Sequence, residues 1–360
     1  MTAVIPELRR RENNLDFLRL MGALAVIVGH AFVLVGRLGD VPRVLGVPIH
    51  QMGVCVFFVI SGYLITKSWV RRPHLPSYLL ARGLRIFPAL GVVSLGTVLV
   101  LGTVLTSLPV ERYLGEPGTW RYMLNVLLRP VFRLPGVFED LPYPGSVNGS
   151  LWTLPAEFAC YLLVPLLMVL PKAARVPATV ILALGVAWYA LEGTAPGIFW
   201  GTSALQSATP WVFFLGGMLC ALLVPRDAFR LDLAFVLLVV SLVATALVPG
   251  QWRVVLWITL PYTILSFGLT ATPFLRRSSR FGDVSYGLYI FAFPVQQVVI
   301  AHLGVLPLAA NVGVVTGVTL VLAFASWHLV EAPAMTLKTR VEAWNDRRAS
   351  RADAETVVTV

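Results

Sequence analysis

Long apolar stretches recur along the whole chain, and short segments with charged residues separate them. A helix that crosses a membrane needs about 20 mainly apolar residues. We therefore expect an all-α fold, a polytopic membrane protein with a bundle of about ten transmembrane helices. The predicted spans are 15–36, 46–66, 86–108, 150–170, 176–191, 200–224, 233–248, 252–273, 284–302 and 307–330.

The composition supports the same class of protein. Of the 360 residues, 57% are hydrophobic and only 13% are charged, whereas a soluble domain carries roughly 25% charged residues. So few charges cannot cover the surface of a water-soluble body of this size. The composition therefore excludes a soluble enzyme, a nucleic-acid-binding domain and a disordered chain.

The net charge of +10 reflects orientation in the membrane and requires no nucleic acid. With ten spans, 20 of the 28 Lys and Arg residues fall on the side of the chain ends, and 7 fall on the opposite side. Basic residues concentrate in cytoplasmic loops. We therefore expect a multi-pass protein of the cytoplasmic membrane with both termini in the cytoplasm.

The spans divide the chain into a membrane domain and two short ends. A loop at 109–149 faces outward and contains six prolines, so we expect it to pack over the bundle as a lid, with an interfacial helix at 120–128. The first apolar stretch is too long for a cleaved signal peptide. The expected segments are a cytoplasmic N-terminal segment at 1–14, a transmembrane domain at 15–335 and a charged cytoplasmic tail at 336–360.

The first span carries three ionisable residues, Asp16, Arg19 and His30. Ionisable groups inside a span are costly and mark functional sites by default. Arg19 and His30 are 11 residues apart, which is about three helical turns plus 20°, so they share one helix face. Asp16 and Arg19 are close enough to pair, or they anchor the helix at the interface. His30 is the candidate proton-transfer group.

Polar residues also occur near the second and third spans. Ser61 lies in an aromatic stretch beside Gly62 and would need a nearby base to act as a nucleophile; close helix packing fits it better. Arg82 and Arg85 immediately precede the third span. Two guanidinium groups three residues apart suit a phosphate, although their spacing alone favours a membrane anchor.

Further polar residues lie in the fourth, ninth and tenth spans. Glu157 is about two turns into the membrane from the outer side, where a carboxylate must pair with a cation or be protonated. Trp152 precedes it. Tyr289 and Gln296 flank Pro294 and can line a polar cavity. Glu331 at the cytoplasmic edge of the last span is expected to cap the helix or to pair with a loop arginine.

The remaining titratable residues predict no metal site. Cys55, Cys160 and Cys220 sit in apolar stretches without ligand spacing and are expected to be packing residues. We find no His/Glu cluster with metal-ligand spacing. Three further histidines lie near span ends and are expected to be solvated: His50, His74 and His302.

From about residue 13 to residue 335, the chain resembles the acyltransferase-3 family of integral membrane acyltransferases. Each matching motif is weak alone, but together and in this order they are specific. Some relatives carry a histidine in the ninth span where this chain has Ala292, which leaves His30 as the single deep imidazole expected. The matching segments are residues 14–19 (NLDFLR) with His30, residues 57–65 (FFVISGYLI), residues 82–88 (RGLRIFP), and residues 150–154 (SLWTL) with Glu157.

The resemblance implies a membrane-bound O-acyltransferase. It would transfer an acyl group, usually acetyl from acetyl-CoA on the cytoplasmic side, to a hydroxyl of a carbohydrate acceptor such as a surface or exported polysaccharide or a glycolipid. By resemblance, Arg82 and Arg85 hold the CoA phosphates with help from Arg19. His30 acts as general base or carries the acyl group transiently. Glu157 is the second candidate catalytic residue.

The acceptor is expected to enter from the outer side. Glu157 and the Trp152 indole are our candidates for orienting it, because an indole face and a carboxylate suit a sugar ring. The other candidate substrate-binding residues are Asp16, Ser61, Tyr289 and Gln296.

Two alternative functions stay open. A solute transporter would also explain intramembrane His and Glu, but we find no inverted repeat of the kind common in transporters. An acyltransferase acting on a cytoplasmic secondary metabolite such as a macrolide would not need the outward loop at 109–149. A receptor or a structural role requires no such series of buried polar groups.

Overall fold

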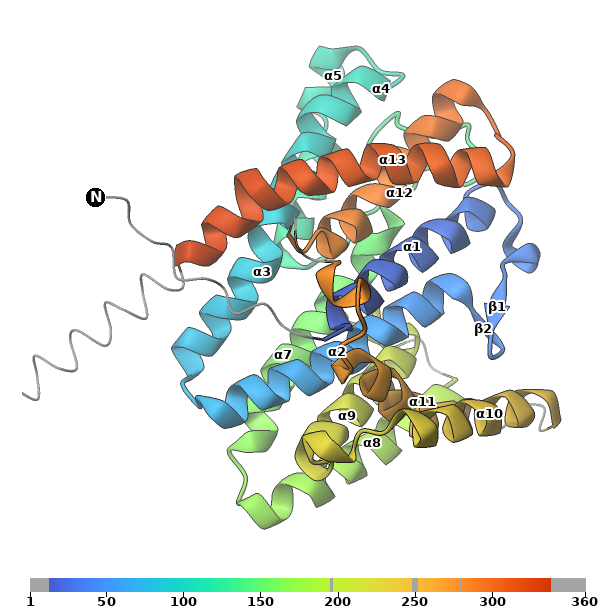
Figure 1. The fold of residues 1–360 in the computed structure, drawn as a ribbon. Helices are drawn as coiled ribbons and strands as arrows, with labels where there is room; N and C mark the ends of the chain where they lie inside the picture. Colours follow the sequence, from blue (N-terminus) through green and yellow to red (C-terminus); the bar gives the residue numbers. More distant parts are fainter. Residues whose placement is uncertain (1–12, 195–196, 248–251, 279, 281, 338–360) are drawn as a thin grey trace, which may run out of the picture.

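The computed structural model describes residues 13–194, 197–247, 252–278, 280 and 282–337. Within these ranges the fold is a bundle of long helices with two small hairpins (Figure 1). The predicted cytoplasmic N-terminal segment, except residues 13 and 14, and most of the predicted tail at 336–360 lie outside the described residues. The long helices are α1 Leu15–Val33, α2 Ile49–Arg71, α3 Leu75–Gly96, α7 Thr153–Met168, α8 Lys172–Glu192, α9 Ala204–Leu223, α10 Leu231–Leu247, α11 Trp252–Leu269, α12 Ser285–Leu303 and α13 Leu308–Ser326.

Each of the ten predicted spans overlaps one of these helices, which confirms an all-α polytopic membrane protein. Among the described residues, nine helical segments are long and apolar enough to cross a membrane. The tenth, α10, is apolar but has 17 residues. The fifth predicted span is a full-length helix, α8, of 21 residues.

The third span differs from its predicted bounds of 86–108. Its helical segment runs from Leu75 to Leu105, so Arg82 and Arg85 lie inside the helix and the predicted loop at 67–85 shrinks to residues 72–74. The sequence was misleading because Arg82 and Arg85 interrupt the apolar pattern. Both side chains are half-buried in the bundle, and Arg85 is paired there with Asp283 and Glu331.

The third span contains a π-helical segment, Thr97–Gly102, followed by α4, Thr103–Leu105. A π turn leaves backbone groups without their usual helical partner. The Tyr113 hydroxyl donates to the Val98 carbonyl oxygen at 2.9 Å. Tyr113 belongs to α5, Val110–Gly115, so this bond ties the following loop to the end of the third span.

The loop between the third and fourth spans packs on one end of the bundle, as expected of residues 109–149. It contains α5, α6 (Pro117–Arg121) and a 3-10 segment, Tyr122–Leu127, which covers the predicted interfacial helix. The Gln297 amide of α12 donates to the carbonyl oxygens of Tyr143 and Ser146 at 3.0 and 2.8 Å. The loop is thereby fixed to the ninth span.

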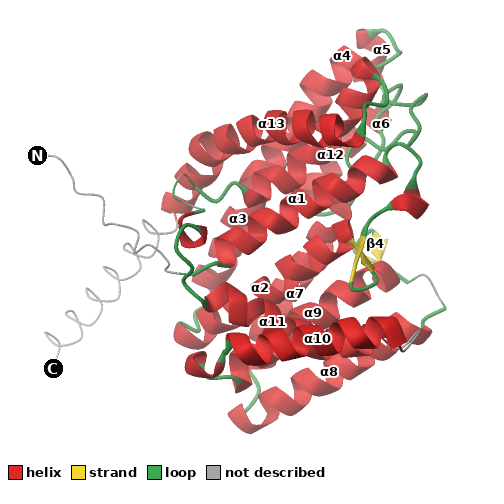
Figure 2. Cartoon of the chain, turned by 45° about the vertical axis from the view of Figure 1, so that its right-hand side comes forward, coloured by secondary structure: helices red, strands yellow, loops and turns green. Residues whose placement is uncertain are grey.

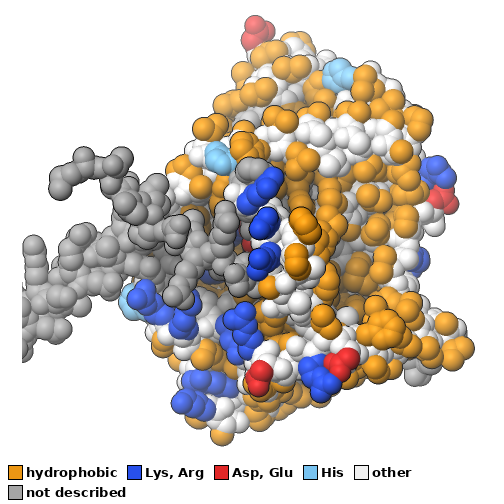
Figure 3. Space-filling model, viewed as in Figure 1, with side chains coloured by type: hydrophobic (Ala, Val, Ile, Leu, Met, Phe, Trp, Pro, Cys, Tyr) orange, Lys and Arg blue, Asp and Glu red, His pale blue; other side chains and the backbone are white. Residues whose placement is uncertain are grey.

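The bundle has two different ends. We call the end with loops 72–74, 169–171, 224–230, 270–278 and 282–284 the basic face. The end with loops 34–48, 106–152, 197–203 and 304–307 is the opposite face. Lys and Arg side chains gather mainly toward the left of Figure 3, and hydrophobic side chains cover most of the rest.

Both hairpins lie at the opposite face together with α5 and α6 (Figure 2). They pair β1 Arg43–Val44 with β2 Val47–Pro48, and β3 Ile198–Phe199 with β4 Thr202–Ser203. Each turn has two residues with positive φ, Leu45 with Gly46 and Trp200 with Gly201. That conformation matches the tight turns that suit the twist of short antiparallel strands.

Helix α2 is central, and it contacts α1, α7, α9 and α11. Its contact with α9 depends on two glycines. A Cβ atom at Gly62 would lie 2.1 Å from the Phe214 carbonyl oxygen, and one at Gly217 would lie 2.2 Å from the Val59 carbonyl oxygen. Glycine allows two helix backbones to approach this closely. This confirms the expected close packing of α2 at Ser61-Gly62.

We expect Gly217→Ala to destabilise the bundle by roughly 1–3 kcal/mol, because the added methyl group must push α2 and α9 apart. The readout is the apparent unfolding temperature of detergent-purified protein. Gly91→Ala is the matched control, since a Cβ there meets no atom within 4 Å and alanine favours a helix. Equal unfolding temperatures of the two variants would contradict this view of the interface.

Candidate functional site

Four charged side chains form a network between the basic face and the interior of the bundle. Arg85 of α3 donates to the Asp283 carboxylate at 2.7 Å, and Arg85 lies 3.4 Å from Glu331. Arg19 of α1 reaches the same Asp283 oxygen at 3.4 Å. The network joins three helical segments, α1, α3 and the end of α13, through the residue just before α12.

Asp283 carries most of this network. Burial alone would raise the pKa of its carboxyl, but Arg85, Arg19 and two hydrogen bonds from Ser285 outweigh burial and hold that pKa at about 2. The carboxylate therefore stays ionised at any physiological pH. Its stabilising contribution is complete above the ordinary aspartate pKa of about 4 and is lost as the pH falls toward 2.

Glu331 is placed by a π-helical segment, Trp327–Glu331, which continues α13. Only 2% of its side chain is exposed. The Ser326 hydroxyl donates to one of its oxygens at 3.0 Å, and Arg85 approaches the other. The predicted pairing of Glu331 with an arginine is thus present, although that arginine belongs to a helix.

Arg82 lies within electrostatic range of Arg19 and Arg85. We call these three arginines, with the carboxylates that face them, the arginine cluster. Two of its arginines retain unused donors. The Nε atoms of Arg19 and Arg82 are buried and have no hydrogen-bond partner among the described residues. The Arg82 guanidinium lies 5.9 Å from the centre of the Tyr78 ring. A buried guanidinium donor without a partner costs free energy, so these two atoms are suited to a ligand with anionic oxygens.

Glu157 is half-buried in the second turn of α7. It accepts a hydrogen bond from the Tyr161 hydroxyl one turn along α7. It also lies within electrostatic range of Arg19, Arg82 and Arg85. The carboxylate therefore belongs to the arginine cluster and compensates part of its positive charge.

His30 lies at the far end of α1 from this cluster. Its ring packs edge-on against Phe293 of α12 with ring centres 5.2 Å apart. Arg19 faces Asp283 at the start of α12, so both α1 residues face the α12 side, as their 11-residue spacing predicted. The Nδ1 atom of His30 is buried and has no hydrogen-bond partner in the described part of the chain.

A second imidazole lies beside His30, contrary to two expectations. His50, in the first turn of α2, was expected to be solvated, and His30 was expected to be the single deep imidazole. The two ring centres are 5.7 Å apart. Glycines at the crossing of α1 and α2 explain the difference, because a Cβ atom at Gly29 would lie 2.5 Å from the His50 Cβ. Helices that approach so closely cover the first turn of α2.

The remaining candidate residues lie in different surroundings. Ser61 is buried in α2, and Trp152 is half-buried at the start of α7. The Tyr289 hydroxyl bonds the Ser150 carbonyl and the Thr153 hydroxyl. Gln296 donates to the Asn311 side chain at 2.8 Å.

Asp16 lies at the basic face, where it lines a small depression with Asp283 and Ser285. Asp283, Tyr161 and His50 were not among our sequence candidates. Tyr161 could have been found from its i,i+4 spacing to Glu157, and Asp283 from its place directly before a span. Within the described ranges, no group of three or more His, Cys, Asp or Glu side chains could hold a metal ion.

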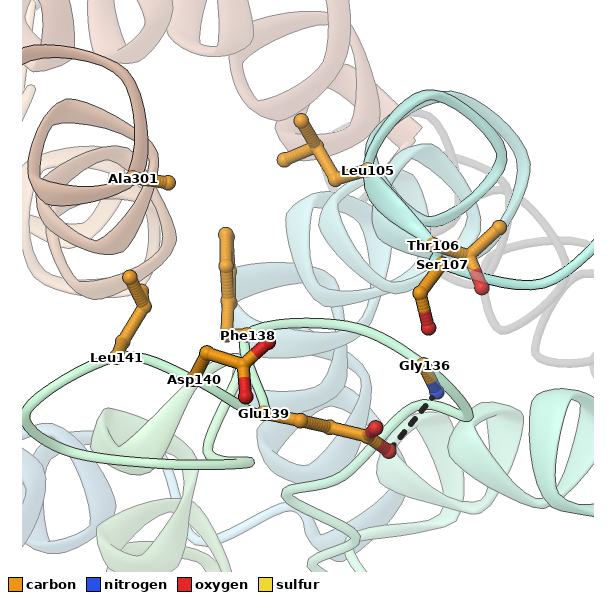
Figure 4. A pocket seen from close by; sticks show the side chains of 9 residues that line it. All are labelled: Leu105, Thr106, Ser107, Gly136, Phe138, Glu139, Asp140, Leu141 and Ala301. Atoms are coloured by element: carbon orange, nitrogen blue, oxygen red, sulfur yellow. Dashed lines mark hydrogen bonds between the residues drawn. The ribbon is translucent and has the colours of Figure 1, made fainter.

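The opposite face contains an open cavity of about 230 Å³. Figure 4 shows Glu139 turned toward the backbone of Gly136, whose N–H donates to it at 3.2 Å. Leu141, also in the lining, packs against a cluster that includes Phe293. The cavity and the His30 ring are therefore linked through Phe293. The lining residues are Leu105, Thr106, Ser107, Gly136, Phe138, Glu139, Asp140, Leu141 and Ala301.

We expect Asp283→Asn to lower the free energy of unfolding by about 3 kcal/mol. This value is at the lower end of what breaking a buried ion pair costs, because the Arg85 and Asp283 side chains are about a fifth exposed. Thermal unfolding of purified protein measures the loss. The difference from wild type should shrink as the pH falls from 4 to 2. Asp40→Asn is the control, since its pair with Arg37 is exposed and should contribute less than about 1 kcal/mol.

Known proteins resemble this chain over nearly its whole length. A 29% identity over 342 residues relates it to an O-acetyl transferase of Shigella phage Sf6, covering 91% of this chain and 97% of the relative. Nodulation protein 10 of Rhizobium leguminosarum bv. viciae is 30% identical over 365 residues, covering 92% and 95%. No solved structure matches.

The family model described as "Acyltransferase domain" matches residues 12–328. This range contains every polar residue of the arginine cluster except Glu331, and it contains both His30 and His50. The chain therefore belongs to the acyltransferase-3 family of membrane acyltransferases.

Proposed function

We propose that the protein transfers an acetyl group from acetyl-CoA to a hydroxyl of a carbohydrate acceptor. The observation that carries the proposal is the arrangement on α1, where an arginine with an unused buried donor and an imidazole with an unused buried nitrogen face the same helix. The O-acetyl transferase relative supports acetyl as the group transferred and oxygen as its destination.

Arg82 is our principal candidate for holding the CoA phosphates. Arg85 is already engaged by Asp283 and Glu331, whereas Arg82 has a buried Nε without a partner. Guanidinium groups bind phosphate oxygens through paired donors. Arg19 adds a second unused Nε, and Arg85 contributes by holding the cluster in place.

The two ends of the molecule fit a reaction in which the acetyl donor and the acceptor bind from opposite sides of the membrane. The basic face suits the cytoplasm by the positive-inside rule, and CoA donors are cytoplasmic. The cavity at the opposite face, with the Thr106 and Ser107 hydroxyls and the Glu139 and Asp140 carboxylates, offers partners for sugar hydroxyls. Such an acceptor would reach the His30 end of α1 from outside.

In the reaction, the acceptor oxygen attacks the thioester carbonyl carbon. The C–O bond forms, the C–S bond breaks, and the electron pair of that bond leaves with sulfur. His30 takes the hydroxyl proton, which ends on the CoA thiol. A positioned base of this kind contributes roughly 10²–10⁴ in rate.

The acceptor and the reaction can be identified together. Cells with and without the protein are compared by mass spectrometry of surface glycans and secreted metabolites, and purified protein is given labelled acetyl-CoA. We expect a glycan to gain one acetyl group and the label to move to it. If the label remains on CoA while a solute crosses the membrane of vesicles that contain the protein, a transporter would be favoured. An acetylated secreted metabolite would favour the secondary-metabolite alternative.

We expect His30→Ala to lower acetyl transfer by at least about a hundredfold, because the base is lost. The variant should still insert, and its size-exclusion profile should match wild type. Retained turnover would remove His30 from the mechanism.

We expect Arg82→Ala to raise the KM for acetyl-CoA by roughly tenfold or more, which corresponds to a lost charge-assisted hydrogen bond of about 1.5–3 kcal/mol. The unfolding temperature should change little, since Arg82 has no ion pair among the described residues. Arg71→Ala, at the exposed end of α2, is the matched control for a basic residue of the same face. An unchanged KM in Arg82→Ala would leave the membrane-anchor reading in place.

A further inference from the structure

The rings of His30 and His50 are held together by the crossing of α1 and α2. A Cβ atom at Gly29 would lie 2.5 Å from the His50 Cβ and 2.7 Å from its Nδ1. One at Gly53 would lie 2.4 Å from the Gly22 carbonyl oxygen. Glycines at both points bring the helices close enough for His50 to reach the His30 ring.

The two rings differ from the other histidines near helix ends. His302 and His328 each place Nδ1 within 3.0 Å of the carbonyl oxygen four residues earlier, at Val298 and Phe324. His30 and His50 instead have buried Nδ1 atoms with no partner among the described residues. An unpaired buried nitrogen costs roughly 1–3 kcal/mol, so packing alone does not account for the pair.

The ring contacts of the pair are with aromatic side chains. From α12 it is faced by Phe293, and the Tyr143 ring of the outer loop lies behind Phe293, with ring centres 6.2 Å apart. His50 is the titratable group whose charge acts on His30. Many catalytic histidines have a carboxylate as their titratable neighbour; the titratable neighbour of His30 is a second imidazole, with the ring centres 5.7 Å apart.

We propose that His50 is a positioning residue that shares with His30 the proton taken from the acceptor hydroxyl. This role rests on the proposed acetyl transfer. An imidazole can take a proton at one nitrogen while giving one from the other. His30 accepts the hydroxyl proton as the C–O bond forms, His50 shares it, and it returns through His30 to the sulfur when the C–S bond breaks.

His50→Gln is expected to lower kcat by at least about tenfold, a fraction of the roughly 10²–10⁴ that a positioned base supplies. The assay follows thiol release from acetyl-CoA by purified protein between pH 5 and 8, with de-O-acetylated surface glycan as the acceptor. His302→Gln, whose ring is bonded to its own helix, is the control and should match wild type.

The pH dependence separates proton sharing from a packing role. If both imidazoles must be neutral, the acid side of the kcat profile steepens from a slope of one toward two in wild type. It should keep a slope of one in His50→Gln. An unchanged profile, or a kcat equal to wild type, would overturn the role of His50.

Gly29→Ala provides a second variant in which both imidazoles remain but His50 is displaced. It should show the same loss of kcat as His50→Gln, with the protein still monodisperse. Full activity in Gly29→Ala would count against the pair. An absence of transfer by the wild type would overturn the proposed function itself, and His50 with it.

Discussion

The ion pair between Arg85 and Asp283 constrains the half of the bundle next to the basic face. A guanidinium inside an apolar helix bundle is tolerated when a carboxylate meets it, and Asp283 lies 2.7 Å away. The same carboxylate receives Arg19, and Arg85 also reaches Glu331. Three spans are thereby held in one register around a point just before α12. Arg82 takes part in no ion pair among the described residues and keeps a buried Nε without a partner, and the donor side of the proposed reaction depends on that difference from Arg85.

Glycines determine the packing in the half of the bundle next to the opposite face. Gly22, Gly29 and Gly53 let α1 and α2 touch backbone to backbone, and this contact brings His50 to the His30 ring. The polar chemistry is thus divided along one helix. Arg19 belongs to the charged network, and His30 lies against the rings of Phe293 and His50. An acyl group that moves between a phosphate-bearing donor and a hydroxyl acceptor needs both environments within one bundle.

Membership of the acyltransferase-3 family agrees with this division, since the family match spans both parts of α1. The segment at 106–152 packs on the opposite face of the bundle. Gln297 bonds it to α12, and Tyr113 bonds it to the π turn of the third span. Its cavity faces away from the arginine cluster. These contacts agree with the proposed reaction, in which the donor and the acceptor bind at different ends of the bundle.

The sequence by itself determines the helical class, the ten spans, the asymmetry of basic residues and the common face of Arg19 and His30, because these follow from local periodicity and composition. It could not show that Arg85 pairs with Asp283, which is 198 residues away, or that Glu157 lies in range of the arginines. It also could not show that His50 meets His30. Those contacts depend on how far each helix is shifted and rotated against its neighbours. That is set by glycine contacts and buried charge between spans, and only the tertiary structure decides it.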